Sequence, residues 1–376
     1  MGKIFSRPPV AVSPETHHFG SVVQSGTLVY SHKITPITDS RFIENDLFFG
    51  LHVNLEDVKV EDRIGMGNFG VVYKAHYKGK RIALKQLLSQ HYNKKTIRDF
   101  QNELNILLVL RHPNIVQFLG AVTDPPTFCL LTELCEGSVV DLLHLAQSRK
   151  IIVTWLLALE IALGCARACA YLHGLDPIIL HRDIKVYAFV SERDRQRANI
   201  SILLVQAENL LLTEKFVCKL SDFGLSRSLQ RNDNAQTLCG TPRWLAPEVF
   251  RGEDYSEKID IYSYGIVLWE LFCFKKPYME HDPINVAYMV AHEELRPELQ
   301  DHIPHVLQRL MTQCWAMDPS QRPSFSRIIT EIEEAKKTIQ LSLPIDVSRP
   351  YDEALAAYQR QNRIPSKPYG LASGRL

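Results

Sequence analysis

Three glycines near the start of the apolar part of the chain have the spacing of a phosphate-binding loop. They are Gly65, Gly67 and Gly70, and a backbone without side chains can approach phosphate oxygens closely. A dinucleotide-binding fold uses the same spacing, but there the glycines open a helix. Here β-branched Val71 and Val72 follow, which favours a continuing strand. The pattern therefore predicts a β-hairpin that covers a nucleotide.

A lysine and a glutamate further along have the types needed to hold such phosphates. Lys85 ends the apolar strand 81–85, where a lysine is most often simply solvated. A lysine that grips phosphate needs a carboxylate to hold it, and Glu103 projects beside the apolar face of an expected helix. That face consists of Phe100, Leu104, Leu107 and Leu108. We therefore expect an ion pair between Lys85 and Glu103.

Three short motifs follow in a fixed order: His181-Arg182-Asp183, Asp222-Phe223-Gly224 and Ala246-Pro247-Glu248. Each is short enough to occur by chance, and an isolated Asp-Phe-Gly is most simply a turn. In this order, and after the glycines and Lys85, they resemble the eukaryotic protein-kinase family. The resemblance covers roughly residues 57–337.

The resemblance implies an α+β fold of two lobes. The kinase domain is expected over 57–337, with a small β-rich N-lobe at 57–135 and a larger helical C-lobe at 136–337. The flanks have a different composition. Residues 1–53 are rich in Ser, Thr, Pro and His and are expected to form a mostly flexible arm, although Leu47-Phe48-Phe49 could pack on the folded body. Residues 342–376 are expected to form a polar tail.

The resemblance also implies catalytic roles. Asp183 would accept the proton of the substrate hydroxyl, and Lys185 would neutralise charge on the transferring phosphoryl group. Asn209 and Asp222 would hold Mg²⁺, because amide and carboxylate oxygens suit this hard cation. Lys85 would grip the α- and β-phosphates of ATP. The chain is thus expected to be a kinase that uses ATP and Mg²⁺.

An ATP site is implied in the same way. Thr132 has the gatekeeper position, and the backbone of Glu133 and Cys135 would hydrogen-bond adenine. The adenine ring would lie between Val72, Ala83 and Leu211. The full set of implied ATP-binding residues is Ile64, Gly65, Gly67, Gly70, Val72, Ala83, Lys85, Thr132, Glu133, Cys135 and Leu211.

Charged residues in two apolar segments are expected to support the site. Asp260 begins the run 260–265, which resembles the helix whose aspartate braces the catalytic loop. Arg322 is expected to form a buried ion pair with Glu248. Both could instead be surface charges, but their apolar surroundings argue against that.

The segment 240–248 resembles the tyrosine-kinase-like group, which includes the Raf and mixed-lineage kinases. Most of that group phosphorylate Ser and Thr. Lys185 and Thr241 support this specificity, since Thr241 is expected to hydrogen-bond Asp183 and Lys185 as in Ser/Thr kinases. Tyrosine or dual specificity is the alternative. Protein substrates with a Ser or Thr acceptor are therefore the expected partners.

Arg182 beside the base suggests control by phosphorylation. An uncompensated arginine there favours a phosphate on the loop between residues 224 and 246. Thr237 is the preferred site, because its spacing to the following glycine matches activating threonines in many kinases. An unmodified loop threonine is the simpler interpretation. The other candidates are Ser226, Ser228 and Thr241.

The catalytic motif is interrupted. After residues 181–185 the chain runs through an insert, residues 186–206, before 207–212 restores the family pattern. Without the insert the sequence would read HRDIKAENLLL. The base Asp183 and the metal ligand Asn209 therefore lie on opposite sides of the insert, and activity depends on how the chain closes there.

Three interpretations of the insert are open. A real β-hairpin costs only about 2 kcal/mol of closure entropy, which an active enzyme can tolerate. A pseudokinase or scaffold results if the insert displaces Asn209, because a shift of about 1 Å can cost roughly a hundredfold in rate. We favour a third: the segment begins with Val186, whose codons start GT, and ends with Gln206, one of whose codons ends AG. GT and AG are the border dinucleotides of a spliceosomal intron. In this hypothesis the segment is therefore a short in-frame intron that was retained in the sequence.

The overall composition is that of a globular protein. The net charge of +1 over 376 residues gives no electrostatic basis for binding nucleic acid. The eight cysteines lack metal-site spacing, and without a signal peptide we expect reduced thiols in the cytoplasm. The apolar stretch 151–172 contains Glu160 and Arg167, so we expect a buried helix rather than a membrane span.

The N-terminal sequence Met1-Gly2-Lys3 with Ser6 fits the N-myristoylation pattern at Gly2. The pattern is short, and an ordinary start is an equal alternative. One acyl chain binds membranes only marginally. We therefore expect at most weak, reversible membrane contact of a cytoplasmic protein.

Overall fold

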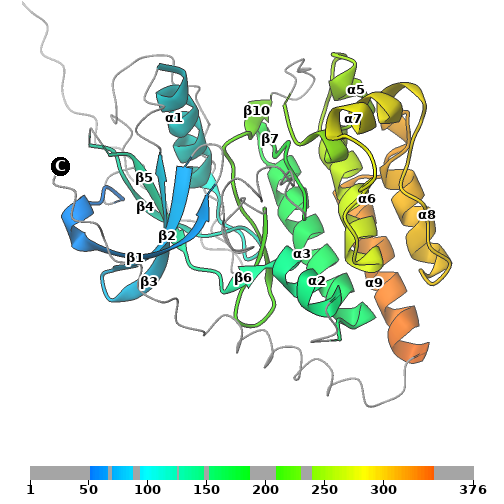
Figure 1. The fold of residues 1–376 in the computed structure, drawn as a ribbon, viewed down its shortest axis with the longest axis horizontal. Coiled ribbons are helices and arrows are strands. Elements are labelled where there is room, and N and C mark those ends of the chain that lie inside the picture. The colour runs from blue at the N-terminus through cyan, green and yellow to red at the C-terminus, as the bar shows by residue number, and fades with distance from the viewer. Residues whose placement is uncertain are drawn as a thin grey trace, which may run out of the picture. The chain divides into compact units, whose positions relative to one another are not determined.

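The computed structural model describes residues 51–66, 70–87, 94–124, 127–147, 152–186, 209–229 and 239–342. The N-terminal part is an antiparallel five-stranded sheet in the order β1-β2-β3-β5-β4, with helix α1 beside it (Figure 1). These elements are β1 (Val58–Met66), β2 (Gly70–Tyr77), β3 (Lys80–Leu87), α1 (Lys94–Val109), β4 (Phe118–Val122) and β5 (Cys129–Glu133). The β-rich N-lobe that the sequence predicts is present.

The chain continues as a strand after the glycines, as predicted. Gly70 is the first residue of β2 and pairs with Leu87 of β3. A Cβ atom on Gly70 would lie 2.3 Å from the carbonyl oxygen of Gln86, so only glycine allows β2 and β3 to pair so closely here. Gly65 pairs with Val72 across the β1–β2 hairpin. Gly67 lies outside the described residues.

The predicted boundary of the N-terminal arm at residue 53 is wrong. The Val53 N–H donates to the Ala121 carbonyl oxygen at 2.9 Å, and the Ala121 N–H donates to the Leu51 oxygen at 2.9 Å. This segment therefore lies along β4, the edge strand of the sheet. Gly120 makes the approach possible, because a Cβ atom there would be 2.7 Å from the Leu51 oxygen. The folded domain begins by Leu51, and the rest of the predicted arm lies outside the described residues.

The C-terminal part is mainly helical, with α6 in contact with α3 and α8, and α9 in contact with the same two helices (Figure 1). The helices are α2 (Val139–Gln147), α3 (Trp155–Gly174), α5 (Pro247–Phe250), α6 (Lys258–Cys273), α7 (Pro283–His292), α8 (His305–Cys314) and α9 (Phe325–Ser342). Helix α9 continues past the predicted domain end at residue 337. The two-lobed protein-kinase fold is confirmed.

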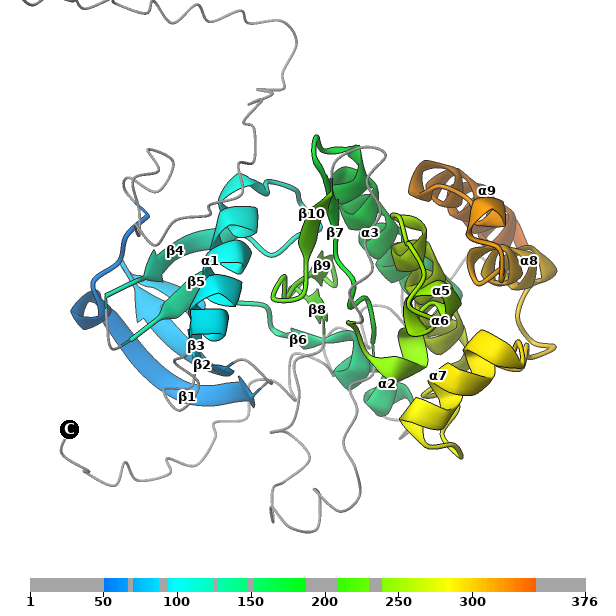
Figure 2. The same cartoon turned by 90° about the horizontal axis from the view of Figure 1, so that it is seen from above.

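Short strand pairs connect the helical part to the sheet region. They are β6 (Gly137–Ser138), β7 (Ile178–Leu180), β8 (Leu210–Leu212), β9 (Cys218–Leu220) and β10 (Arg227–Leu229). Strand β8 pairs with β6 and β9, while β10 pairs with β7 (Figure 2). The residues before and after these strands carry the predicted catalytic motifs.

Helix α3 is the predicted buried helix. By length and composition it could cross a membrane, but 67% of its apolar stretch is buried inside the protein. It packs against α6 and α9 and against strand β9. A core helix accounts for this burial. All eight cysteines lie in the described part of the chain, and each is a free thiol.

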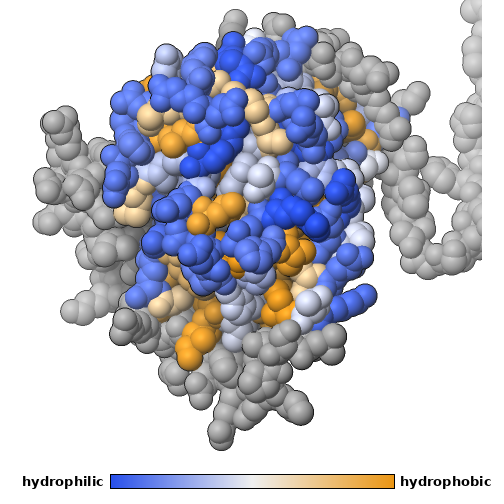
Figure 3. Space-filling model, turned by 90° about the vertical axis from the view of Figure 1, so that its right-hand side faces the viewer, coloured by the Kyte–Doolittle hydropathy of each residue, from blue (hydrophilic) through white to orange (hydrophobic). Residues whose placement is uncertain are grey.

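The outer face of the helical part is mostly hydrophilic, with hydrophobic side chains in small separate groups (Figure 3). The most exposed large hydrophobic residues of the described chain include Met279, Ile284 and Ile152. By contrast, helix α6 is buried along almost its whole length. The polar residues inside α6 are therefore the unusual ones.

Candidate active site

Asp183, the predicted base, is buried and held by two side chains. Lys185 donates from Nζ to Asp183 Oδ2 at 2.5 Å, and Thr241 donates from Oγ1 to Asp183 Oδ1 at 2.6 Å. Lys185 Nζ also lies 2.8 Å from Thr241 Oγ1. The expected contacts of Thr241 with Asp183 and Lys185 are thus present. They fix the orientation of the carboxylate that would face a substrate hydroxyl.

Asn209 reaches the same carboxylate from the other side of the insert. Its Nδ2 donates to Asp183 Oδ2 at 2.9 Å and to the Asp183 carbonyl oxygen at 2.5 Å. Asn209 is fully buried, yet its Oδ1 has no hydrogen-bond partner among the described residues. A buried acceptor without a donor is costly unless something else binds it. Oδ1 is therefore available to a cation, as the prediction of a magnesium ligand requires.

Lys85 forms the predicted ion pair. Its Nζ lies 2.7 Å from Glu103 Oε1 on α1 and 2.9 Å from Asp222 Oδ1. Burial alone would lower the pKa of Lys85, but the carboxylates of Asp222 and Glu103 raise that pKa above its ordinary value. The ammonium group therefore stays charged. In protein kinases this lysine–glutamate pair must be in place for activity.

The pKa values of the two carboxyl groups paired with Lys85, those of Glu103 and Asp222, shift in opposite directions. Burial raises the pKa of Glu103, and Lys85 offsets only part of this rise. For Asp222 burial also raises the pKa, but the charge and hydrogen bond of Lys85, with smaller contributions from Lys185 and His181, lower it to about 2. Asp222 is consequently a carboxylate at neutral pH, the form that binds a cation.

The backbone at Asp222 has an unusual conformation. Its φ is 60°, in the left-handed region that non-glycine residues seldom adopt. The next residue, Phe223, is buried and packs edge-to-face against His181, with ring centroids 5.1 Å apart. Strain of this kind persists where surrounding contacts hold it, often at functional sites. The surrounding contacts here are the packing of Phe223 on His181 and the ion pair of Asp222 with Lys85.

Asp260 braces the catalytic motif as predicted. Its Oδ2 accepts from the His181 N–H at 2.9 Å and its Oδ1 from the Arg182 N–H at 2.8 Å. His173 Nε2 lies 2.9 Å from Oδ2. Burial would raise the pKa of Asp260, but the hydrogen bonds and charges of His173 and His181 lower it. Since Arg182 has a φ of 66°, this carboxylate holds a strained backbone in place.

The side chain of Arg182 has two neutral partners in the described chain. Its Nε donates to the Leu225 carbonyl oxygen at 2.6 Å, and one guanidinium nitrogen donates to the Tyr255 hydroxyl at 3.1 Å. No carboxylate neutralises it among the residues that the structure describes. Thr237, the predicted phosphorylation site, lies outside those residues.

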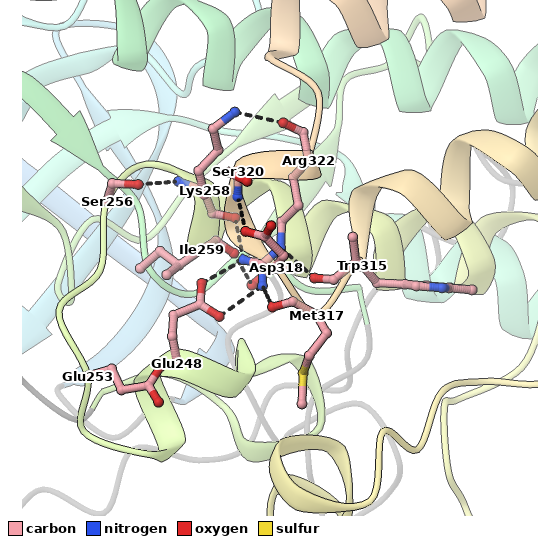
Figure 4. Close-up of polar contacts among 12 residues, drawn as sticks. Glu248, Glu253, Ser256, Lys258, Ile259, Trp315, Met317, Asp318, Ser320 and Arg322 are labelled. Atoms are coloured by element: carbon pink, nitrogen blue, oxygen red, sulfur yellow. Dashed lines mark hydrogen bonds and ion pairs between the residues drawn. The ribbon is translucent and has the colours of Figure 1, made fainter.

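The predicted ion pair of Glu248 and Arg322 is present and buried (Figure 4). Two guanidinium nitrogens of Arg322 donate to the two Glu248 oxygens at 2.6 and 2.8 Å. Arg322 Nε also donates to the Ala316 carbonyl oxygen at 2.9 Å, and Lys258 Nζ donates to the Arg322 carbonyl oxygen at 2.7 Å (Figure 4). The pair joins the segment after Thr241 to the end of the helical lobe.

Two of the predicted adenine-binding residues keep partly exposed surface where both of their neighbours in sequence are buried. Ala83 is half-buried between Ile82 and Leu84, which are both buried. Leu211 is half-buried between two fully buried leucines in the same way. Ala83 also pairs with Thr132 across β3 and β5. Val72, Thr132, Glu133 and Cys135 are half-buried too, and Ile64 is exposed.

One detail of the adenine prediction is restricted by the structure. The Glu133 N–H donates to the Gln117 carbonyl oxygen at 2.9 Å, so it cannot also serve adenine. The Glu133 side chain accepts from the Gln117 N–H at 2.7 Å and from Lys219 Nζ at 2.6 Å. For Glu133, this leaves the carbonyl oxygen as the backbone group for a hydrogen bond to adenine. For Cys135, the expected contact with adenine would be made by the N–H.

Two functional candidates were missed in the sequence. Lys219 links β9 to the adenine-binding segment through Glu133. Glu270, a fully buried residue of α6, accepts hydrogen bonds from Trp244 and Val186. A signal for Glu270 existed, since a carboxylate inside the apolar run 266–272 needs a buried partner. For Lys219 no comparable signal exists, because a strand lysine is usually solvated.

Comparison with known proteins agrees with this geometry. The family profile "Protein kinase domain" matches residues 58–203, and "Protein tyrosine and serine/threonine kinase" matches residues 204–332. The chain belongs to the protein-kinase family. The junction between the two matches falls inside the insert.

Curated relatives are serine/threonine kinases by name. "Probable serine/threonine-protein kinase drkB" of Dictyostelium discoideum is 35% identical over 285 residues, which cover 76% of this chain and 38% of the relative. "Serine/threonine-protein kinase CTR1" of Arabidopsis thaliana is 35% identical over 275 residues, covering 73% of this chain and 31% of the relative. "Probable serine/threonine-protein kinase SIS8", also of Arabidopsis thaliana, is 35% identical over 291 residues, covering 76% and 25%. The chain thus spans less than half the length of each of these relatives.

Proposed function

We propose that this chain transfers the γ-phosphate of ATP to Ser or Thr residues of protein substrates. The observation that carries the proposal is the contact of Asn209 with Asp183 across the insert, at 2.9 Å between Nδ2 and Oδ2. This contact brings the proposed base Asp183 and the proposed metal ligand Asn209 into one site, although the insert separates them in sequence. The Lys85–Glu103 pair at 2.7 Å supports the same conclusion.

Each residue of the site has a role in this reaction. Asp183 orients the acceptor hydroxyl and takes its proton, and Lys185 and Thr241 hold Asp183 in the required orientation. Lys185 also neutralises charge on the transferring group. Asn209 Oδ1 and the carboxylate of Asp222 would hold Mg²⁺, whose chemistry when bound is to neutralise the phosphate oxygens. Lys85 would bind the α- and β-phosphates.

The nucleotide site is proposed on the half-buried residues of the strands around it. Val72, Ala83 and Leu211 would contact the adenine ring, while the carbonyl of Glu133 and the N–H of Cys135 would hydrogen-bond its edge. The remaining proposed contacts are Ile64, Gly65, Gly67, Gly70 and Thr132. Isothermal titration of the full chain with ATP and Mg²⁺, compared with an Ala83→Phe variant that fills the site, tests this placement.

The test of activity uses the full chain, ATP, Mg²⁺ and a generic Ser/Thr protein substrate, with Asp183→Asn as the control. We expect phosphate on Ser or Thr, identified after hydrolysis of the product, and loss of transfer in the control. Phosphotyrosine as the main product would contradict the proposed specificity. Transfer at the level of the control would contradict the proposed activity.

A pseudokinase or scaffold is the second candidate, and the insert between Asp183 and Asn209 is the observation that favours it. In that case ATP binding would persist while transfer stays at the level of Asp183→Asn.

The retained-intron hypothesis makes a separate prediction at the level of the gene. Mature transcripts would lack the codons for residues 186–206, and the DNA that encodes this segment would begin with GT and end with AG. Mature transcripts that retain these codons would contradict the hypothesis.

We further propose that Arg182 receives a phosphate on Thr237. The support is that the described partners of the Arg182 guanidinium are a carbonyl and a phenol, which leave its charge to be neutralised. Thr237→Ala should lower the transfer rate, and Arg182→Gln should remove any effect of Thr237→Ala. An additive loss in the double variant would contradict the pairing.

Weak membrane contact through a myristoyl group on Gly2 is a proposal as well, and so is a cytoplasmic location. Gly2 lies outside the described residues, so the support is the sequence pattern alone. Co-sedimentation with lipid vesicles after expression with an N-myristoyltransferase tests it. Gly2→Ala should abolish sedimentation, and equal sedimentation of both proteins would contradict it.

A further inference from the structure

Glu270 is a buried carboxylate outside the motifs described in the sequence analysis. It lies in the second half of α6, within the apolar run 266–272, and its exposed fraction is zero. Its Oε2 accepts a hydrogen bond from Trp244 Nε1 at 2.8 Å. The same oxygen accepts from the backbone N–H of Val186 at 3.2 Å. Hydrogen bonds to an ionised acceptor are stronger than those between neutral groups.

Val186 is the point at which the insert begins. It directly follows Lys185, which donates to Asp183 at 2.5 Å. The side chain of Val186 is fully buried, so its N–H is also cut off from water and needs a protein acceptor. Glu270 supplies that acceptor from a helix whose position does not depend on the insert.

We propose that Glu270 is a positioning residue that fixes the catalytic motif at its junction with the insert. It holds the backbone of Val186, and through Val186 it holds Lys185 and Asp183 in register with Asn209. The inference rests on the proposed kinase activity, because the groups it positions are those of the phosphotransfer site. It assigns to α6 a second buried contact with the catalytic motif, ten residues after Asp260.

The need for such a contact follows from the insert. In an uninterrupted catalytic loop, a short covalent connection restrains the position of the base relative to the metal ligand. Here residues 186–206 lengthen this connection, and a longer loop in general restrains its two ends less. Non-covalent contacts must then hold each end, and small displacements of reacting groups reduce rates strongly. Asn209 is held by Asp183. Val186 is held by Glu270.

The competing explanation is that Glu270 serves only to bind Trp244 and thereby the segment after Thr241. The two contacts share one oxygen atom but can be separated by substitution. Trp244→Phe removes the indole donor and leaves the Val186 contact intact. Glu270→Leu removes both contacts with little change in volume. Glu270→Gln keeps an oxygen acceptor of similar geometry but removes its charge.

The experiment combines amide hydrogen exchange at Val186 with steady-state kinetics, on the full chain and these three variants. In Glu270→Leu we expect exchange at Val186 to accelerate at least about tenfold because the N–H loses its acceptor. We also expect kcat to fall by about a hundredfold, with KM for ATP within about twofold of the parent. Glu270→Gln should show smaller changes in the same direction.

The matched control is Trp244→Phe, which should leave exchange at Val186 unchanged and lower kcat by less than about tenfold. Unchanged exchange at Val186 in Glu270→Leu would overturn the proposal, as would a loss of kcat in Trp244→Phe equal to that in Glu270→Leu. If Glu270→Leu does not fold, Glu270→Gln is compared with Trp244→Phe instead. The exchange rate at Val186 and the loss of kcat remain the two criteria. If no form of the chain transfers phosphate, the proposed activity fails, and exchange at Val186 still tests separately whether Glu270 holds that backbone N–H.

Discussion

The two halves of the catalytic motif, on either side of the insert, are held by different parts of the protein. The upstream half, 181–186, is attached to helix α6, where Asp260 accepts two backbone N–H groups and Glu270 a third. The downstream half begins at Asn209 and continues as β8, which pairs with β6 and β9. The Asn209 carbonyl oxygen also accepts from the Ser221 N–H at 2.9 Å.

This difference shows why an interrupted motif can still form one site. Each half has its own buried anchors among the described residues. The halves meet at Asp183, where Lys185 and Asn209 both donate to the same carboxylate oxygen. Substitutions can break either side or the meeting point, and the comparison predicts a different result for each.

The largest effect is expected at the meeting point. Asp183→Asn removes the base and the charge that Lys185 and Asn209 share, so kcat should fall by roughly a thousandfold. Because the amide keeps the size of the side chain, the thermal unfolding midpoint should stay close to that of the parent. The measurement is phosphate transfer under saturating ATP. Residual activity within tenfold of the parent would show that another group acts as the base.

Breaking the downstream half should lower activity through the metal as well as through Asp183. For Asn209→Ala we expect kcat to fall by about a hundredfold and the Mg²⁺ concentration for half-maximal rate to rise. Asn209→Asp is the matched control, since it keeps an oxygen ligand but loses the Nδ2 donor to Asp183. The Mg²⁺ requirement of Asn209→Asp should stay nearer to that of the parent. Equal Mg²⁺ requirements in all three proteins would argue against Asn209 as a ligand.

Breaking the upstream anchor should cost stability in a pH-dependent way. The pKa of Asp260 is lowered in the folded protein, so its contribution is complete above the unfolded pKa of about 3.9 and is lost as the pH falls through the folded value. Asp260→Asn should therefore lower the free energy of unfolding at pH 7 by about 1.5–3 kcal/mol. Urea unfolding of both proteins from pH 6 to pH 3 measures this. The difference between them should shrink as the pH decreases, and a constant difference would contradict the charged role of Asp260.

The smallest effect is expected at Thr241, which supports Asp183 but belongs to neither half. Thr241→Val removes one hydrogen bond to the base and should lower kcat by about tenfold, which corresponds to about 1.4 kcal/mol. Thr241→Ser keeps the hydroxyl and should restore most of the rate. Equal losses in the valine and serine variants would indicate that the methyl group, and not the hydrogen bond, is what matters.

Much of the fold and site was predictable because short motifs carry their own geometry. The Lys85–Glu103 pair was indicated by a carboxylate beside the apolar face of a helix, while the Asp260 brace and the Glu248–Arg322 pair were implied by the resemblance to protein kinases. Glu270 is also a carboxylate among apolar residues but belongs to no short motif, and its partner is a backbone N–H beyond the reach of pattern analysis. The contact of Leu51 and Val53 with β4 depends on the bare backbone of Gly120, which no periodicity in the sequence indicates.

The central claim is that the two halves assemble a working site in spite of the insert. The most direct test compares phosphate transfer by the full chain with transfer by the same chain lacking residues 186–206, each beside its Asp183→Asn variant. We predict that the full chain retains a kcat within about tenfold of the shortened chain, since Val186 and Asn209 are anchored by different contacts. Transfer by the shortened chain alone, with the full chain no faster than its Asp183→Asn variant, would contradict this account.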